Sequence, residues 1–178
     1  NMWHDKEFVL PMVQWRGISL QYAADDLKGN KDIALAACKQ NMNALHYVSS
    51  VLWSNKEFVL PMVTLQGTAV RYASDDLKND EDIVLAAFTS AAKELGINVD
   101  DHMPLKSLVL AVVRKDGKSL EYASERLQAD PEVARAAATS GGLNLCIASN
   151  RLKGNRVVVL EAVKQNGTGA LQYASDDL

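Results

Sequence analysis

The sequence has few of the residues that build disulfide frameworks or metal sites. Its 178 residues include two cysteines and three histidines. Cys38 and Cys146 lie far apart and are not in CxxC spacing, which does not favour a disulfide framework or a zinc site. His4, His46 and His102 form no HExxH pairing. We therefore expect neither a metal ion nor another cofactor.

Long apolar runs and strong charge of one sign are also lacking. No apolar run approaches the roughly 18–20 residues of a transmembrane helix, so we expect no membrane span. The formal net charge of −3 gives no reason to expect a nucleic acid as partner. No basic segment leads into an apolar stretch at the start, as a secretory signal would. With two unpaired cysteines, this predicts an intracellular protein, in the cytoplasm.

Motifs of catalysis are missing as well. There is no G-x-x-x-x-G-K-[ST] loop, and no Ser, Cys or Asp stands in the context of a nucleophile elbow. The acidic stretch from Asn79 to Asp82 lacks the glycine and the twelfth-position glutamate of a calcium loop. We do not expect an enzyme.

What the sequence has instead is repetition. The octapeptide KEFVLPMV runs from Lys6 to Val13 and recurs from Lys56 to Val63. Alignment of the chain with itself gives a 25-residue unit, and alternate units are the more alike, so the larger period is about 50 residues. Such periodicity is typical of a stacked array in which each unit buries its apolar face against its neighbours. Units start near residues 5, 30, 55, 80, 105, 130 and 155.

Each unit has the pattern of a helix-turn-helix pair. Asp or Asn opens six of the seven units, where it would cap a first helix. Glycines follow that helix at one equivalent position, and we expect them to adopt positive φ there. The second helix is indicated by apolar residues at spacings of three and four, as in Leu20, Ala23 and Leu27. The predicted fold is an all-α solenoid of these units, forming a single array over residues 1–178. The equivalent glycines are Gly17, Gly67, Gly117, Gly142 and Gly167.

Pro11 and Pro61 fall about six residues into the first helix of their units. An interior proline removes a backbone hydrogen bond and costs roughly 3 kcal/mol in an ordinary helix. Duplication of a tolerated kink would explain the pair. Alternatively, the kink sets the curvature of the array, or the helix begins only at the proline.

The chain begins with residues that match the tail of a unit, since Met2–Trp3 correspond to Leu52–Trp53. It ends at Leu178, the equivalent of Leu27. We expect either a segment of a longer array or ends that meet in an oligomer.

The recurring pattern resembles the domain of unknown function 4116 repeat family. The match is carried by NKEFVLPMVTLQGTAVRYASDDLKNDEDIVLAA at 55–87, LVLAVVRKDGKSLEYASERLQADPEVARAA at 108–137 and VVVLEAVKQNGTGALQYASDDL at 157–178. It is weakest at residues 89–104, where we expect a distorted unit. The family consists of tandem units of nearly 50 residues with no established activity, so the resemblance implies a fold and no chemistry.

Two sets of side chains recur along the array. One is aromatic and the other acidic. Either the tyrosines edge the core and the acids form a solvated ridge, or together they line a groove for a basic peptide or helix. The candidate partner-binding residues are Tyr22, Tyr47, Tyr72, Tyr122, Tyr173, Asp25, Asp75, Asp76 and Glu125; the acidic set extends to Asp26, Asp100, Asp101, Asp176 and Asp177.

These observations favour a non-enzymatic scaffold that binds a protein or peptide. A structural spacer or self-assembling array is the alternative. RNA binding is less favoured, because the positions that vary between units carry too few Lys and Arg residues to follow a phosphate backbone.

Overall fold

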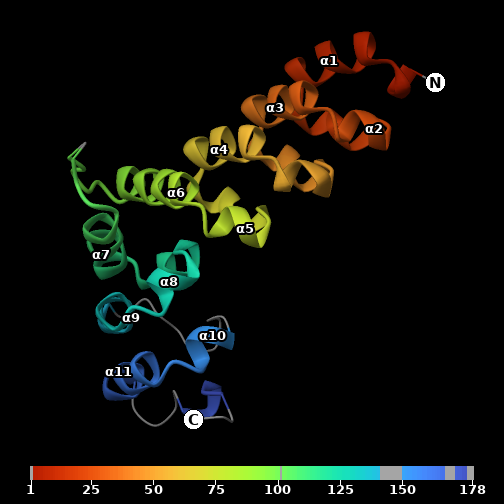
Figure 1. The fold of residues 1–178 in the computed structure, drawn as a ribbon. Coiled ribbons are helices and arrows are strands. Elements are labelled where there is room, and N and C mark those ends of the chain that lie inside the picture. The colour runs from red at the N-terminus through yellow and green to blue at the C-terminus, as the bar shows by residue number, and fades with distance from the viewer. Residues whose placement is uncertain (1, 101, 141–149, 167–170, 176–178) are drawn as a thin grey trace.

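The computed structural model describes residues 2–100, 102–140, 150–166 and 171–175, and these residues contain helices and no strand. The expected all-α repeat fold is confirmed. Each unit begins with a longer α-helix, and these helices stack in two rows (Figure 1). They are α1 (Lys6–Trp15), α3 (Lys31–Gln40), α4 (Lys56–Leu65), α6 (Glu81–Glu94), α7 (Leu105–Lys115), α9 (Pro131–Thr139) and α11 (Arg156–Asn166).

The predicted caps are confirmed. In each case a side-chain oxygen accepts a hydrogen bond from a backbone N–H of the first turn, which satisfies a donor that has no partner within the helix. Asp80, for example, accepts from Asp82 and Ile83 at 3.1 and 3.3 Å. The capping residues are Asp5, Asn30, Asn55, Asp80, Asp130 and Asn155.

The second half of the unit is not the single helix that the sequence predicts. In the first, third and fifth units a 3₁₀-helix and a four-residue α-helix replace it, separated by residues in extended conformation such as Ala24, at φ −62° and ψ 156°; in the second unit both short elements are 3₁₀-helices. This break lets the Ala24 N–H donate to the Trp3 carbonyl of the preceding unit, and Ser49 and Ser74 bond in the same way. The 3₁₀-helices are η1 (Met2–His4), η2 (Gly17–Tyr22), η3 (Met42–Tyr47), η4 (Ser50–Ser54), η5 (Gly67–Tyr72) and η6 (Gly117–Tyr122). The short α-helices are α2 (Asp25–Lys28), α5 (Asp75–Lys78), α8 (Glu125–Gln128) and α10 (Asn150–Lys153).

The repeated glycine serves close packing, and the expectation of positive φ is wrong at the described positions. Among the described residues, positive φ occurs at Gly96 alone. A Cβ added to Gly17 would lie 2.2 Å from the Ala37 carbonyl oxygen, and one added to Gly67 would lie 2.7 Å from the Ala87 carbonyl oxygen. Glycine is therefore required because the next helix passes directly over this position.

Both internal prolines lie within regular helix. The helices α1 and α4 start at Lys6 and Lys56, five residues before Pro11 and Pro61. The alternative that the helix begins only at the proline is therefore wrong.

The fourth unit is distorted, as its weak match predicts. Helix α6 runs for 14 residues. In other units an extended residue such as Arg16 or Gln66 ends the first helix and a 3₁₀-helix follows. Residues 91–94 read AAKE, and these strong helix formers continue the helix instead. Of the segment that leads to α7, residues 95–100 and 102–104 form no regular helix.

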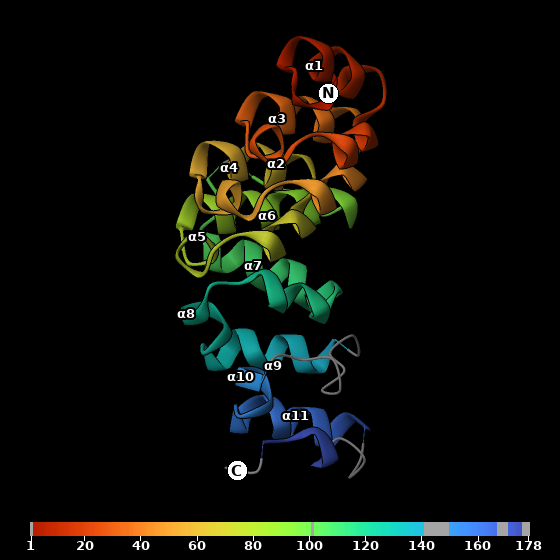
Figure 2. The ribbon, with the colours of Figure 1, turned by 90° about the vertical axis from the view of Figure 1, so that its right-hand side faces the viewer.

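The array bends at this unit. Figure 1 shows α1, α3, α4 and α6 in one row and α7, α9 and α11 in another, set at an angle to the first. The short helices α5 and α8 approach each other on the inner side of the bend, as the turned view in Figure 2 also shows.

The apolar core divides at the same place. One buried cluster extends from Val9 to Ala87 and the other from Val84 to Ala162. They meet in α6, which contributes Ile83 and Ala87 to the first and Val84 to the second. Within the described residues, no helix is both long enough and apolar enough to cross a membrane.

Candidate partner-binding surface

The recurring tyrosines lie at the surface. Tyr22, Tyr47, Tyr72 and Tyr173 remain 61%, 37%, 40% and 39% exposed, and Tyr122 is half-buried. Tyr22, Tyr47, Tyr72 and Tyr122 each end a 3₁₀-helix whose preceding residues, such as Ser19 and Leu20, are buried. One edge of each of these 3₁₀-helices therefore packs into the core while the terminal ring faces outward.

Neighbouring aromatic rings fix two of these tyrosines. The ring of Tyr72 stacks on Trp53 with centroids 5.0 Å apart, and its hydroxyl lies 3.2 Å from Nδ1 of His46. The rings of Tyr22 and Trp3 lie in the equivalent place, with their centroids 5.4 Å apart. The two tryptophans stand 50 residues apart, as the larger period requires, and sequence reasoning missed their role although this spacing was visible.

Tyr122 lies at the bend and bridges the two rows. The guanidinium of Arg71 lies 5.4 Å from the centre of its ring and donates a hydrogen bond of 3.0 Å to its hydroxyl. Arg71 also pairs with Glu121 at 3.6 Å. Tyr122 packs against both core clusters. These contacts join residues about 50 positions apart, and nothing in the repeat pattern predicts them.

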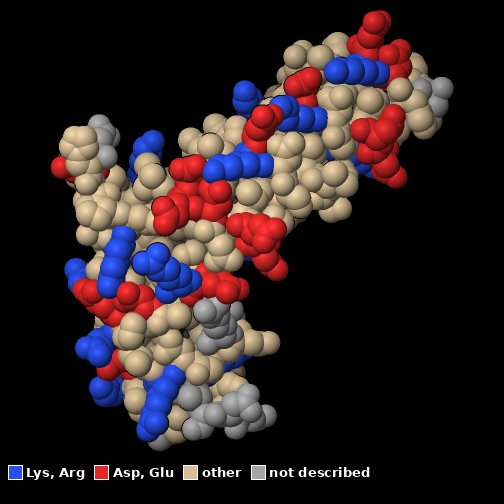
Figure 3. Space-filling model, in the orientation of Figure 1, with Lys and Arg blue, Asp and Glu red and all other residues tan. Residues whose placement is uncertain are grey.

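The described members of the acidic set are exposed. Asp25 and Asp75 each pair with the lysine three residues later, at 3.3 Å in both cases. Figure 3 shows acidic side chains gathered over α2 and α5. Three members of the acidic set lie outside the described residues, as do two of the equivalent glycines and one cysteine; they are Asp101, Asp176, Asp177, Gly142, Gly167 and Cys146.

The bend brings three of the candidate residues to one cavity. Asp75, Tyr122 and Glu125 line a hollow of 240 Å³ between the segments 70–79 and 121–128. Asn79 closes one side of it by accepting a hydrogen bond of 2.9 Å from the backbone N–H of Glu125. The other candidates, among them Tyr22 and Tyr47, lie along the array and do not line this cavity.

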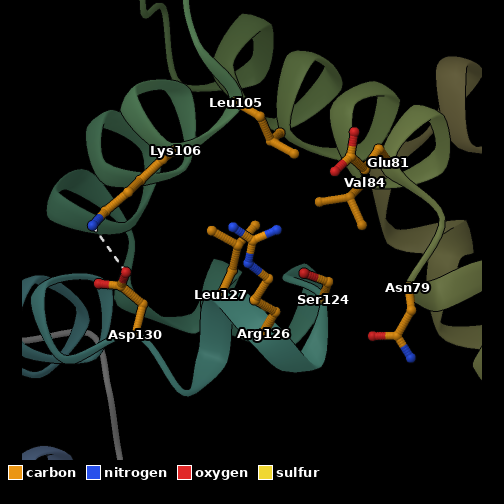
Figure 4. Close-up of a pocket in the computed structure, with 9 residues that line it drawn as sticks. All are labelled: Asn79, Glu81, Val84, Leu105, Lys106, Ser124, Arg126, Leu127 and Asp130. Atoms are coloured by element: carbon orange, nitrogen blue, oxygen red, sulfur yellow. Dashed lines mark ion pairs between the residues drawn. The ribbon is translucent and has the colours of Figure 1, made fainter.

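A second cavity, of 360 Å³, is also lined by Asn79 (Figure 4). Figure 4 shows the guanidinium of Arg126 directed into it, with Glu81 on the opposite wall. Apolar side chains of Val84, Leu105 and Leu127 also line it, together with the ion pair of Lys106 and Asp130. Both of these hollows at the bend have charged and apolar walls.

A regular row of ion pairs runs along the long helices, and sequence reasoning missed it. A lysine in the first turn of the long helix meets an acid of the next unit, as in Lys31–Glu57 at 2.5 Å. Figure 3 shows basic and acidic side chains alternating along the first row. The signal was a lysine followed by an acid 24 or 26 residues later. The pairs are Lys6–Asp32, Lys31–Glu57, Lys56–Asp80, Lys56–Asp82, Lys106–Asp130 and Lys106–Glu132.

The ion pairs shift the titration of their members. The hydrogen bond from Lys56 lowers the pKa of Asp80, and that from Lys106 lowers the pKa of Asp130. Both aspartates also cap helices, so the ionised form is the one that the fold favours. Burial raises the pKa of the Cys38 thiol to about 12, and this cysteine acts as a small apolar residue of α3.

Among the described residues, no group of three or more His, Cys, Asp or Glu side chains is placed so that it could hold a metal ion. What the inner side of the bend presents is aromatic surface, carboxylates and two hollows. Such a surface suits the binding of another molecule.

Comparison with known proteins places the chain in a family. No curated protein and no solved structure matches it. A family model described as domain of unknown function (DUF4116) matches residues 5–53, 55–95, 106–153 and 130–178. Each match spans about two of the 25-residue units, in agreement with the larger period. Because the matches together cover nearly the whole chain, this protein belongs to the DUF4116 family.

Proposed function

We propose that this protein is a non-enzymatic helical-repeat scaffold whose inner surface binds a basic, extended segment of a partner protein. The observation that carries the proposal is the cavity lined by Asp75, Tyr122 and Glu125. It combines an aromatic ring with carboxylates at a place where the two rows face each other. Aromatic anchors and complementary charge are features of protein interfaces.

The charges around this cavity favour a cation as its occupant. Three acids line it, Asp75, Glu121 and Glu125, against the bases Arg71 and Lys78. Asp75 and Glu121 pair with Lys78 and Arg71, so a lysine or arginine side chain of a partner would compete with these two bases for the carboxylates, and its methylene stem would lie beside Tyr122. The exposed Tyr72, on the neighbouring 3₁₀-helix, extends the aromatic surface along the array.

Capture from lysate of the source cells, treated with nuclease, tests the proposal. The double variant Asp75→Lys/Glu125→Lys should release a partner that the natural chain retains. The matched control Asp25→Lys/Asp26→Lys changes equally exposed acids on α2, away from the bend, and should retain it. A partner held equally by both variants would contradict binding at this cavity, and one released by nuclease would favour RNA.

A spacer or self-assembling array is the alternative function. Capture of no stoichiometric partner would favour it over the scaffold. We also propose an intracellular, cytoplasmic location, which the buried thiol of Cys38 supports because it takes part in packing and not in a disulfide.

A further inference from the structure

Two of the four charged side chains that line the 360 Å³ cavity are unpaired. Lys106 and Asp130 form an ion pair of 2.8 Å, which Figure 4 marks. Arg126 and Glu81 are exposed, and neither forms an ion pair or a side-chain hydrogen bond with another described residue. The described walls of the cavity therefore hold one unpaired cation and one unpaired anion.

Both unpaired side chains reverse the charge that the repeat has at their positions. Glu81 stands where the first three units and the fifth have a lysine. Arg126 stands where the first and third units have Asp26 and Asp76. The bend places these two reversals at one cavity. Ion pairing along the array does not explain them, because neither side chain has a partner in a neighbouring described unit.

The walls of the cavity also offer apolar surface. Val84 on α6 is buried, and Leu105 on α7 and Leu127 on α8 are half-buried. Figure 4 shows the guanidinium of Arg126, on α8, directed into the cavity, whereas Glu81 belongs to α6. The volume of 360 Å³ lies within the range of about 300–1,000 Å³ that is typical of small-molecule sites, which combine apolar walls with a few polar groups.

We propose that this cavity binds a short peptide that has free termini and apolar side chains. The carboxylate of the peptide accepts two parallel hydrogen bonds from the guanidinium of Arg126, and its ammonium group pairs with Glu81. Its side chains cover Val84, Leu105 and Leu127, and removal of that apolar surface from water favours binding. Because different helices supply the two charges, a ligand with a charge at each end suits the cavity better than a free amino acid, in which one carbon carries both.

This site is separate from the one in the proposed function. The 240 Å³ cavity is lined by three acids and two bases, whereas the 360 Å³ cavity is lined by two of each. The first therefore favours a cation, and the second favours a molecule with one charge of each sign. Asn79 lines both cavities, but Glu81 and Arg126 line only the second. Capture of a partner through Asp75 and Glu125 is thus an independent test.

Isothermal titration calorimetry with leucyl-leucine tests the proposal, since this dipeptide has both charged termini and two apolar side chains. Leucyl-leucinamide lacks the carboxylate, and N-acetyl-leucyl-leucine lacks the ammonium group. Each should bind about fivefold more weakly than leucyl-leucine, which is the contribution of one good ion pair at an exposed site. Diglycine keeps both charges but lacks the apolar side chains, and should bind more weakly still.

The combination of variants with these modified peptides is the decisive measurement. Arg126→Gln should bind leucyl-leucine and leucyl-leucinamide equally, because the carboxylate has lost its partner, and should still discriminate against the N-acetyl form. Glu81→Gln should show the reverse, whereas a purely structural role of either residue would weaken all the peptides alike. The controls Arg114→Gln and Glu94→Gln make the same changes at exposed positions outside the cavity, and should bind as the natural chain does. Circular dichroism establishes that each variant is folded.

Three results would overturn the proposal. The first is the absence of saturable binding of leucyl-leucine up to its solubility. The second is equally tight binding of N-acetyl-leucyl-leucinamide, which imitates an internal segment of a longer chain and would assign the cavity to a protein partner. The third is equally tight binding of free leucine, which would assign the cavity to an amino acid.

Discussion

Replacement of Gly67 by alanine tests the reason for the repeated glycine. An added Cβ would lie 2.7 Å from the Ala87 carbonyl oxygen and 3.3 Å from the Ser90 Cβ. The nearest atom is backbone in the middle of α6, so no flexible side chain can move aside. Gly67 also donates its N–H to Ser90 Oγ at 3.0 Å, and a shift of the helices would lengthen that bond.

The expected cost follows from two opposing effects. Overpacking a close contact costs typically about 1–3 kcal/mol. Alanine also restricts the conformations of the unfolded chain, which stabilises the folded state by about 0.4–1 kcal/mol where the native conformation suits alanine. We therefore expect Gly67→Ala to lower the free energy of unfolding by about 1–2 kcal/mol, and the midpoint of urea unfolding with it.

Gly29 provides the matched control. It lies at the end of α2 with helical dihedral angles, φ −87° and ψ −3°. The atoms nearest to an added Cβ are 3.4 Å or more away, which is ordinary contact. Gly29→Ala should be neutral or stabilise by up to about 1 kcal/mol. If Gly67→Ala is as stable as Gly29→Ala, the helices do not approach as closely as the structure shows, and the reasoning is wrong.

Three further predictions concern packing and charge. Phe58→Ala should lower the free energy of unfolding by about 3–5 kcal/mol because the ring is fully buried. Phe8→Ala, in the other copy of the same octapeptide, should lower it clearly less, and thermal unfolding of the monomer measures the difference. Tyr72→Ala should cost about 1–2 kcal/mol through loss of the stack on Trp53 and leave the chain folded, whereas Tyr72→Phe should cost little; circular dichroism during urea titration distinguishes them. The pKa of Asp80 is lowered in the fold, so its ionised form stabilises the protein above the ordinary value of 3.8 and this contribution is lost as pH falls below it. Asp80→Asn keeps a capping side chain but removes the charge, and should therefore flatten that part of the acid unfolding curve.

The sequence predicts the features of this fold that depend on residues within one unit. Asp130 caps α9 and Pro131 stands at its first position, so local chemistry alone sets that helix start. The spacing of Leu20, Ala23 and Leu27 correctly marks buried positions, since all three are buried. It does not reveal that the backbone is extended at Ala24, because that conformation depends on a hydrogen bond to the preceding unit.

The candidate surface depends on contacts between units, and these are harder to predict from the sequence. The tyrosines and acids are evident as recurring types, but the bend selects which of them meet. Tyr122, Asp75 and Glu125 line one cavity because the two rows turn toward each other there. No periodic pattern encodes a turn that occurs at one place in the array.

Three regularities are interrupted at that turn, and one local cause explains them. In the row of ion pairs, the fourth unit has Glu81 where the first three units and the fifth have lysine, and Ser107 stands where the next unit would carry the acid. The core divides in α6. The backbone hydrogen bond that Ser74 makes to Trp53 has a different counterpart at the bend, where Glu125 donates to the side chain of Asn79.

The common cause is the extension of α6. Helix formers at residues 91–94 continue α6 into the segment that would otherwise form the 3₁₀-helix and the short helix of that unit. Because the fourth unit lacks this 3₁₀-helix and short helix, α7 has no regular partner on the inner side of α6. Leu105 and Glu81 instead both line the 360 Å³ cavity. The hollow therefore lies where an intact unit would place its ion pair and its short helix. The extension of α6 thus produces both the bend and its cavities. A partner that fills these hollows would contact both rows at once, and its affinity would depend on the angle between them.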